Sequence, residues 1–275
     1  MGIGPARKLR LRHDGGKMLA SAKWSKKTLD SWLGLAQFCR GSVVRRWNLR
    51  PVYQVANSGD RTNDVAIPSA RAKTSIRRVL DSLDERRSFF HRATTWLIPD
   101  AEIAEMCANG DASQKHGYGG SLLLGGKLLY FFGEWSPELR AAKVNIAVLE
   151  AWVILMITTT WGHLFEGKKI IIRTDSAASC FCLNKLWSDS NGMSVICELW
   201  EELQHTFSFE GLVTHCAGTA NRLPDICSRM EEPAIEPAMI EVLRQKGVSA
   251  TLERVEAKWT AGRVDIRVER LLMSV

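Results

Sequence analysis

The fold of this chain is decided by a run of six residues, Ile170-Ile171-Ile172-Arg173-Thr174-Asp175. Three consecutive β-branched residues predict a buried strand, which we place at residues 168–174. Asp175 follows directly, so its carboxylate is expected at the carboxyl end of the strand, where α/β sheets usually bind ligands. An isolated Asp after a strand also commonly caps a helix, so Asp175 taken alone supports a structural role about equally well.

A second informative acid, Glu150, lies in an apolar helix predicted at residues 145–161. Glu150 is the only charged residue between Ile146 and Trp161, whose apolar residues cover nearly every face of a helix. Because an unpaired buried carboxylate is very costly, we expect Glu150 to meet a cation, either a metal ion or a buried Arg or Lys. The run is shorter than the roughly 20 residues of a membrane span, and it contains a charge, so no membrane association is expected.

Two further acids complete the candidate site. Asp111 follows a strand that we place at 102–110, so its carboxylate should emerge beside that of Asp175 if the two strands are parallel neighbours. Asp225 follows Pro224, which suits the first turn of a helix, where an acid complements the helix dipole. A cluster of acids without a nearby Lys or Arg indicates a divalent cation, and all-oxygen ligands suit Mg²⁺ or Mn²⁺.

The second half of the chain predicts an α/β fold. Three antiparallel strands followed by crossover-linked parallel strands give a mixed five-stranded sheet with flanking helices. We place the strands at 102–110, 118–124, 127–132, 168–174 and 209–214, and the helices at 145–161, 176–186, 192–206 and 224–230. This predicts a domain over 101–231, followed by a tail, 232–275, for which the pattern indicates no function.

The first hundred residues predict a mainly helical, basic region. Amphipathic spacing indicates helices at Lys27–Cys39 and Arg71–Phe90. Residues 1–100 hold 20 Lys or Arg against 8 Asp or Glu, a net charge of +12, whereas residues 101–275 hold 17 against 22, a net charge of −5. The asymmetry favours a basic module that grips a polyanion beside an acidic module, although a solvated basic surface is the alternative. The candidate contact residues are Lys23, Lys26, Lys27, Arg45, Arg46 and Arg50.

Composition bounds the setting of the protein. The chain has 275 residues and 45% hydrophobic content, enough for one or two packed domains. Its seven cysteines include no Cys-x-x-Cys pair, so a zinc site at His215, Cys216 and Cys227 is not favoured. The odd cysteine count and the lack of a recognisable signal peptide favour an intracellular location, cytoplasmic or nuclear.

Five blocks of the second half occur in the order found in one known family. They are Gly110-Asp111-Ala112-Ser113, Gly117-Tyr118-Gly119-Gly120 with Glu134-Trp135-Ser136, Asn145 to Glu150, Thr174-Asp175-Ser176 with Leu183-Asn184-Lys185, and His215 to Arg229. Together they resemble the ribonuclease H domains of retroelement reverse transcriptases, particularly those of DIRS-like tyrosine-recombinase retrotransposons. The last block is the most specific, because it resembles the family's His-x-Pro-Gly-x-x-Asn-x-x-Ala-Asp-x-Leu-Ser-Arg pattern.

The resemblance implies a ribonuclease H that cleaves the RNA strand of RNA–DNA hybrids with two Mg²⁺ ions. Asp111, Glu150, Asp175 and Asp225 would hold the metals, and His215 would take part in proton transfer and product release. Ser113, Asn184 and Asn221 would be candidates for contacts to RNA 2′-hydroxyls. Residues 1–100 resemble, less specifically, the thumb or connection region of such enzymes, so upstream reverse transcriptase domains are expected partners.

Departures from the family pattern keep alternatives open, among them Asn109-Gly110 in place of the usual Thr before Asp111. Pro224 replaces the usual Ala before Asp225 and fixes the backbone there, and Ala217 replaces a usual Pro. A degenerate, non-catalytic module that binds nucleic acid or braces a polymerase is one alternative, and another two-metal nuclease of the same fold is a second. The chain contains no Asp-Asp dipeptide, so the polymerase signature is missing and DNA synthesis is not expected.

Overall fold

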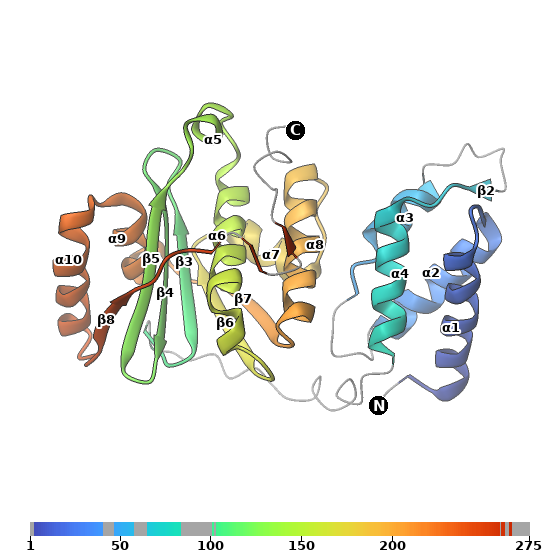
Figure 1. Cartoon of the computed structure of the whole chain (residues 1–275), viewed down its shortest axis with the longest axis horizontal. Helices are drawn as coiled ribbons and strands as arrows, with labels where there is room; N and C mark the ends of the chain where they lie inside the picture. The colour runs from blue at the N-terminus through green and yellow to red at the C-terminus, as the bar shows by residue number, and fades with distance from the viewer. Residues whose placement is uncertain are drawn as a thin grey trace. The chain divides into compact units, whose positions relative to one another are not determined.

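The computed structural model describes residues 3–40, 47–57, 65–83, 101, 103–258, 260–261 and 264–265. The chain divides into two compact units, Met1–Leu97 and Ile98–Val275 (Figure 1). Each unit has a hydrophobic core of its own.

The first unit is helical and packs around tryptophans. Trp24, Trp32 and Trp47 are almost fully buried in its core. The Trp32 indole donates a hydrogen bond to the Leu11 carbonyl at 3.1 Å, so burial leaves its one polar group satisfied. The elements are α1 (Pro5–Ala20), β1 (Trp24–Ser25), α2 (Lys26–Arg40), α3 (Arg50–Asn57), β2 (Val65–Ala66) and α4 (Ala70–Ser82).

Both helices predicted for this unit are present as α2 and α4. The amphipathic pattern placed the second helix as far as Phe90, whereas α4 ends at Ser82. Residues 84–90 lie outside the described residues. Ser69 caps α4, because its side chain accepts a hydrogen bond from the Ala72 amide at 3.1 Å.

The second unit is a mixed α/β fold built on a six-stranded sheet. The strand order is β7-β6-β3-β4-β5-β8, with β3–β4 and β4–β5 antiparallel and the other pairs parallel. The strands are β3 (Cys107–Ala112), β4 (Gly117–Leu124), β5 (Lys127–Glu134), β6 (Lys169–Thr174), β7 (Glu210–His215) and β8 (Thr251–Arg254). A separate pair, β9 (Thr260–Ala261) and β10 (Val264–Asp265), follows them.

The number of strands corrects the prediction of a five-stranded sheet. The sixth strand, β8, comes from the tail for which the sequence indicated no function, and it pairs in parallel with β5 from Lys127↔Thr251 to Tyr130↔Arg254. β8 is four residues long and mostly exposed. Its sequence, Thr-Leu-Glu-Arg, has no alternation of apolar and polar residues that would predict a strand. Only the pairing with β5 defines it as one.

The first strand also differs from the prediction of residues 102–110. β3 begins at Cys107, after Met106 adopts a left-handed backbone with φ of 57°. It continues to Ala112, and Asp111 pairs with Gly119 of β4. Asp111 therefore lies within the strand, because the antiparallel hairpin with β4 carries the pairing past the point where the apolar residues end.

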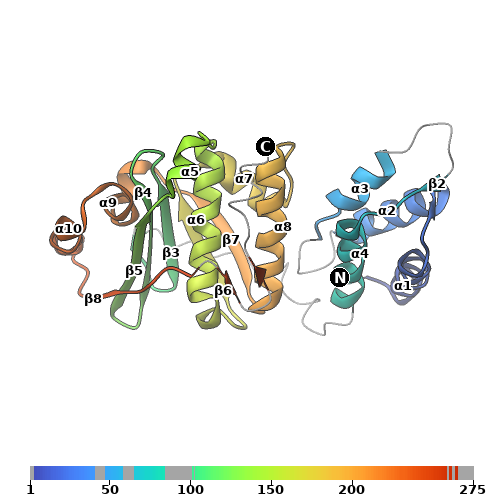
Figure 2. The same ribbon diagram turned by 45° about the horizontal axis from the view of Figure 1, so that its top comes forward.

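Helices cover both faces of the sheet, and β5 shows how the faces are divided. Leu129 and Phe131 of β5 face one core with α6, whereas Leu128 and Tyr130 face another with α9 and α10. Figure 2 shows the strands β3, β4 and β5 between α6 and α9. The helices are α5 (Pro137–Ala141), α6 (Ile146–Trp161), α7 (Ala177–Lys185), α8 (Asn191–Thr206), α9 (Arg222–Arg229) and α10 (Glu232–Gln245).

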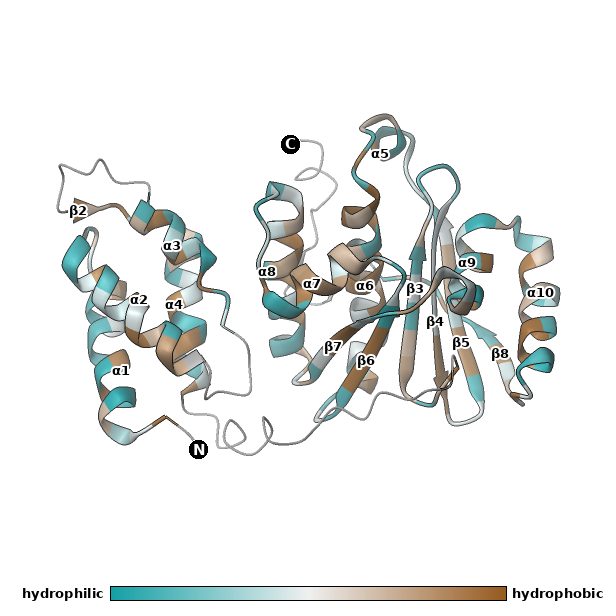
Figure 3. Ribbon diagram, turned by 180° about the vertical axis from the view of Figure 1, so that it is seen from behind, coloured by the Kyte–Doolittle hydropathy of each residue, from teal (hydrophilic) through white to brown (hydrophobic). Residues whose placement is uncertain are grey.

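The strand β6 and the helix α6 form the apolar centre of this unit. β6 is buried from Ile170 to Thr174, in keeping with its hydrophobic colour in Figure 3. Residues Ile146–Leu164 are long and apolar enough to cross a membrane by length and composition, but 83% of the apolar 18-residue stretch within them is buried. Burial on this scale is typical of a central core helix.

Candidate metal centre

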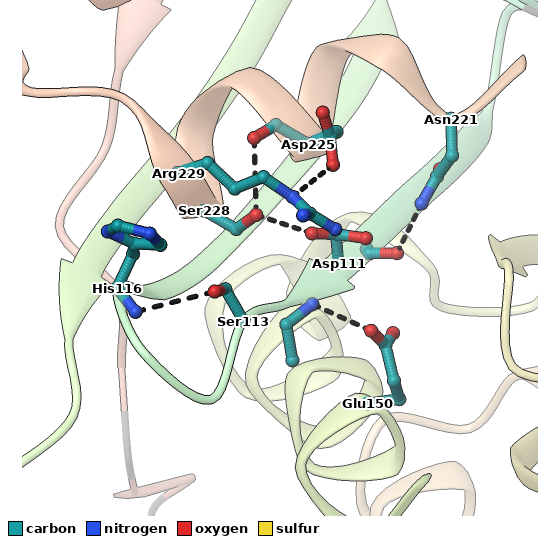
Figure 4. A network of polar contacts seen from close by, with 10 residues as sticks. Asp111, Ser113, His116, Glu150, Asn221, Asp225, Ser228 and Arg229 are labelled. Atoms are coloured by element: carbon teal, nitrogen blue, oxygen red, sulfur yellow. Dashed lines mark hydrogen bonds and ion pairs between the residues drawn. The ribbon is translucent and has the colours of Figure 1, made fainter. Parts of the chain in front are cut away.

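Three acidic residues converge at the end of the sheet where the parallel strands β3 and β6 have their carboxyl ends. Asp111, Glu150 and Asp175 each offer an oxygen atom, and these atoms lie within 4.8 Å of one another. β3 and β6 are parallel neighbours, with Asn109 opposite Arg173, so the residues two positions further on come to the same edge. Glu150 reaches that edge from α6, which packs on β3 (Figure 4).

Glu150 joins the two strands that carry the other acids. One carboxylate oxygen accepts the Ala112 amide of β3 at 2.9 Å, and the other accepts the Thr174 hydroxyl of β6 at 2.8 Å. Only 3% of Glu150 is exposed, and it makes no ion pair with Lys or Arg among the residues that the structure describes.

The electrostatics of Glu150 favour an additional positive charge. Burial raises the pKa of Glu150 to about 8, and the neighbouring Asp111 carboxylate acts in the same direction. The hydrogen bonds from Ala112 and Thr174 lower the pKa of Glu150 and so oppose this effect. The charged form of a buried acid with this environment is unfavourable until a cation offsets its charge.

Asp111 lies in a similar environment. It is 1% exposed, and burial raises its pKa to about 6. Asp175 and Asp225 add to this rise, while Arg229 lowers the pKa of Asp111. The Ser228 hydroxyl donates a hydrogen bond to Oδ2 of Asp111, which also lowers the pKa.

The donor set suits a hard divalent cation. All three groups are carboxylates, their oxygens are mutually close, and two of them have raised pKa values. Mg²⁺ and Mn²⁺ prefer such oxygen ligands. No other group of three or more acidic, His or Cys side chains with this spacing occurs among the described residues, so the alternative of a site at His215, Cys216 and Cys227 gains no support.

Asp225, the fourth predicted ligand, lies beside the triad but outside it. It stands in the first turn of α9, and its Oδ1 forms an ion pair with Nε of Arg229 one turn later. It is close enough to Asp111 to raise the pKa of that carboxyl. The structure thus brings three of the four predicted acids together, whereas the fourth, Asp225, is paired with Arg229.

His215 ends β7 at the same edge of the sheet. It is exposed and lies opposite Thr174 of β6 in the strand pairing. The loop that follows passes beside Asp175, since a Cβ added to Gly218 would stand 3.5 Å from Oδ2 of Asp175. His215 is therefore accessible to solvent, and the loop that follows it lies next to Asp175.

The three polar residues predicted to contact RNA each make hydrogen bonds within the protein. The Asn184 side chain donates to the Val213 carbonyl at 2.5 Å and accepts the Val213 amide at 3.0 Å, which ties α7 to β7. Asn221 is 1% exposed and donates to the Gly110 carbonyl at 3.0 Å. Ser113 is 9% exposed and accepts the His116 amide at 3.3 Å. Asn221 and Ser113 are buried and Asn184 is half-buried, and a contact of any of them with RNA stays a prediction.

The basic candidates of the first unit differ in exposure. Lys23 and Lys27 are exposed, and Lys26 is half-buried. Arg50 is buried, with 8% of its surface exposed, so little of it is available to phosphates in this conformation, and its role stays a prediction. Arg45 and Arg46 lie outside the described residues.

Sequence reasoning missed the roles of three residues around the acids. Thr174 and Ser228 donate hydroxyl hydrogen bonds to Glu150 and Asp111, and Arg229 pairs with Asp225. For Arg229 a signal was present, because an acid and an Arg four residues apart on a helix are neighbours. No comparable signal marks the two hydroxyl groups.

Comparisons with known proteins add no family to this geometry: no protein-family model matches the chain, and no curated protein matches it. The fold and site together define a mixed α/β unit with a buried acidic triad that could hold a metal ion.

Proposed function

We propose that the chain is a metal-dependent nuclease of the ribonuclease H type, which hydrolyses the RNA strand of RNA–DNA hybrids as part of a retroelement reverse transcriptase. The observation that carries the proposal is the convergence of Asp111, Glu150 and Asp175 within 4.8 Å at one sheet edge. These are three of the acids that the motif resemblance singled out. The mixed order of the sheet is compatible with the same family.

The carboxylates of the proposed site would divide between two Mg²⁺ ions. Asp111, Glu150 and Asp175 would hold one ion, and Asp111 with Asp225 would hold the other. When bound, the pair of ions would supply activation of a water molecule and charge stabilisation for the leaving 3′-oxygen. Mn²⁺ could substitute, because its ligand preferences are similar.

The protein's own groups keep the site in order. The Ala112 amide and the Thr174 hydroxyl hold the two oxygens of Glu150, so that carboxylate is oriented before any ligand binds. Ser228 orients Asp111 in the same way. His215, exposed at the end of β7 opposite Thr174, would be the candidate for proton transfer.

The substrate is inferred from charge as well as from the site. A net charge of +12 over residues 1–100 favours contact with a phosphate backbone, and exposed Lys23 and Lys27 belong to that region. The acids of the second unit would repel the same backbone except where divalent cations reverse the local sign.

The test is cleavage of a labelled RNA–DNA hybrid by the full chain in Mg²⁺. Asp175→Asn should abolish cleavage, because Asn keeps the shape of Asp but removes the charge that retains the metal. Asp189→Asn, the same change at an exposed residue of this unit, is the matched control and should cut like the wild type. Equal rates for Asp175→Asn and wild type would exclude Asp175 as a ligand.

Substrate choice separates the proposed activity from a different nuclease activity. Double-stranded DNA, single-stranded DNA and double-stranded RNA should remain intact under conditions in which hybrid is cut. Preferred cleavage of DNA would favour another two-metal nuclease and would contradict the ribonuclease H proposal.

A second candidate, a non-catalytic module that binds nucleic acid, is favoured by one observation. Asp225 is paired with Arg229, an arrangement that a site without a second ion would also adopt. Binding of hybrid without cleavage, in either Mg²⁺ or Mn²⁺, would support this candidate over the enzyme.

A further inference from the structure

The side chain of Arg229 supplies a positive charge beside the acidic cluster. Its Nε pairs with Oδ1 of Asp225, and its charge also lowers the pKa of Asp111. Figure 4 shows the Arg229 side chain running back along α9 toward Asp225. The helix α9 therefore carries both Asp225, a proposed metal ligand, and Arg229, a cation that is paired with it.

The backbone of α9 is fixed closely against the sheet. A Cβ added to Gly119 of β4 would overlap the Cβ of Cys227 and come within 2.8 Å of the Pro224 carbonyl oxygen. The Ser228 hydroxyl further ties α9 to Asp111. Because the helix is in direct contact with the strand, a change in the partner of Asp225 must come from rotation of side chains.

Both side chains of the ion pair are partly exposed to solvent. Asp225 is 44% exposed and Arg229 is 52% exposed, in contrast to the buried Asp111 and Glu150. Exposed pairs at this one-turn spacing are weak, since water screens their attraction and both side chains lose rotational freedom. A divalent cation near Asp111 carries twice the charge of Arg229 and has a second carboxylate to bind.

We infer that Arg229 is a positioning residue: it holds Asp225 in the metal-free protein and competes with a divalent cation for that carboxylate. The inference rests on the proposed metal-dependent function and adds a control of metal affinity to it. Arg229 neutralises part of the acidic cluster when the metal is absent. When a cation binds at Asp111, Asp225 exchanges its internal partner for the ion.

The experiment is calorimetric titration of the full chain with Mn²⁺ in the absence of nucleic acid. Arg229→Gln should bind Mn²⁺ about threefold to tenfold more tightly than the wild type, because a competing charge close to the site is removed. Arg229→Lys keeps the charge and should bring the affinity back toward that of the wild type. Arg222→Gln is the control, since Arg222 is on the same helix but bonds to Gln245 of α10.

A double substitution separates competition for Asp225 from a general effect of charge. In an Asp225→Asn background, Arg229→Gln should change Mn²⁺ affinity much less than in the wild-type background. Equal affinities for wild type and Arg229→Gln overturn the inference, as does an equal gain in both backgrounds. Absence of Mn²⁺ binding by both proteins overturns it too. Failure of the proposed function gives a different result, namely Mn²⁺ binding that depends on Arg229 in a protein that does not cut hybrid.

Discussion

The two units of the chain place their charges in opposite ways. In residues 1–100 the net charge is +12, and basic side chains such as Arg10, Arg12 and Lys27 are exposed on helices around an apolar core. In residues 101–275 the net charge is −5, and Asp111 and Glu150 are buried at the carboxyl ends of two neighbouring strands. Exposed charges are stabilised by water and indicate a partner only weakly, whereas buried charges are unfavourable and indicate a ligand strongly.

The largest expected effect tests whether the buried acids of the second unit bind a ligand. Glu150→Gln should reduce hybrid cleavage by at least about 100-fold, because even the outer-shell partners of metal ligands are typically worth 10–100-fold. The amide can still accept one hydrogen bond, so the fold should be retained. Cleavage rates in Mg²⁺, with circular dichroism to verify folding, measure the effect. A rate within a few-fold of wild type would show that burial at position 150 serves packing alone.

The raised pKa values predict how the stability of the metal-free protein depends on pH. The folded form holds protons on Glu150 up to about pH 8 and on Asp111 up to about pH 6, above their ordinary values of 4.5 and 3.8. Stability from these groups is therefore greatest below about pH 4 and falls as pH rises from about 4 to 8.

Thermal unfolding of the metal-free protein between about pH 5 and pH 8 measures this loss. Glu150→Gln should flatten the decline in the melting temperature of the second unit, since Gln does not ionise. Added Mg²⁺ or Mn²⁺ should raise that melting temperature most at about pH 8, because ionisation of Asp111 and Glu150 then leaves the most negative charge for a cation to offset. A steeper decline in Glu150→Gln than in wild type would contradict the assignment of the raised pKa to Glu150.

A third prediction concerns the contact between α9 and the sheet, which keeps Asp225 and Ser228 beside the triad. Gly119→Ala should lower the free energy of unfolding by about 1–3 kcal/mol, because the added methyl group overlaps Cys227. Gly16→Ala on α1, where nothing lies within 4 Å of the new Cβ, should be neutral or stabilising. Chemical denaturation of both variants provides the comparison. Wild-type stability for Gly119→Ala would show that α9 can move away from β4.

The sequence predicted the apolar elements of the site better than its polar contacts. The β-branched run of β6 and the continuous apolar run of α6 each have a pattern that fits one structure, and their acids were placed correctly relative to them. β3 was misplaced, because Asn109-Gly110-Asp111 has no hydrophobic alternation to mark its end. β8 has none either, and its pairing partner is more than a hundred residues away.

The internal hydrogen bonds of the polar residues were not predicted, for a related reason. Asn184 and Asn221 stand near the acids in the motif, which suggested contacts to substrate. Their hydrogen-bond partners, Val213 and Gly110, are 29 and 111 residues away in sequence. A local motif does not reveal such partners, so it does not distinguish a side chain that binds a ligand from one that holds the strands in place.

The smallest expected effect tests the exposed side of the comparison. Replacing Lys23 and Lys27 with Gln should weaken hybrid binding by roughly threefold to tenfold, because each lysine that binds a phosphate releases condensed counterions. It should also reduce the slope of log affinity against log salt by up to about 0.9 for each phosphate that is no longer bound. Binding is measured over a salt series with Ca²⁺ replacing Mg²⁺ to suppress cleavage, and Lys168→Gln, an exposed lysine of the second unit, is the control. An unchanged affinity and slope would mean that these lysines form a solvated surface, and that the charge asymmetry of the chain has a different origin from nucleic-acid binding.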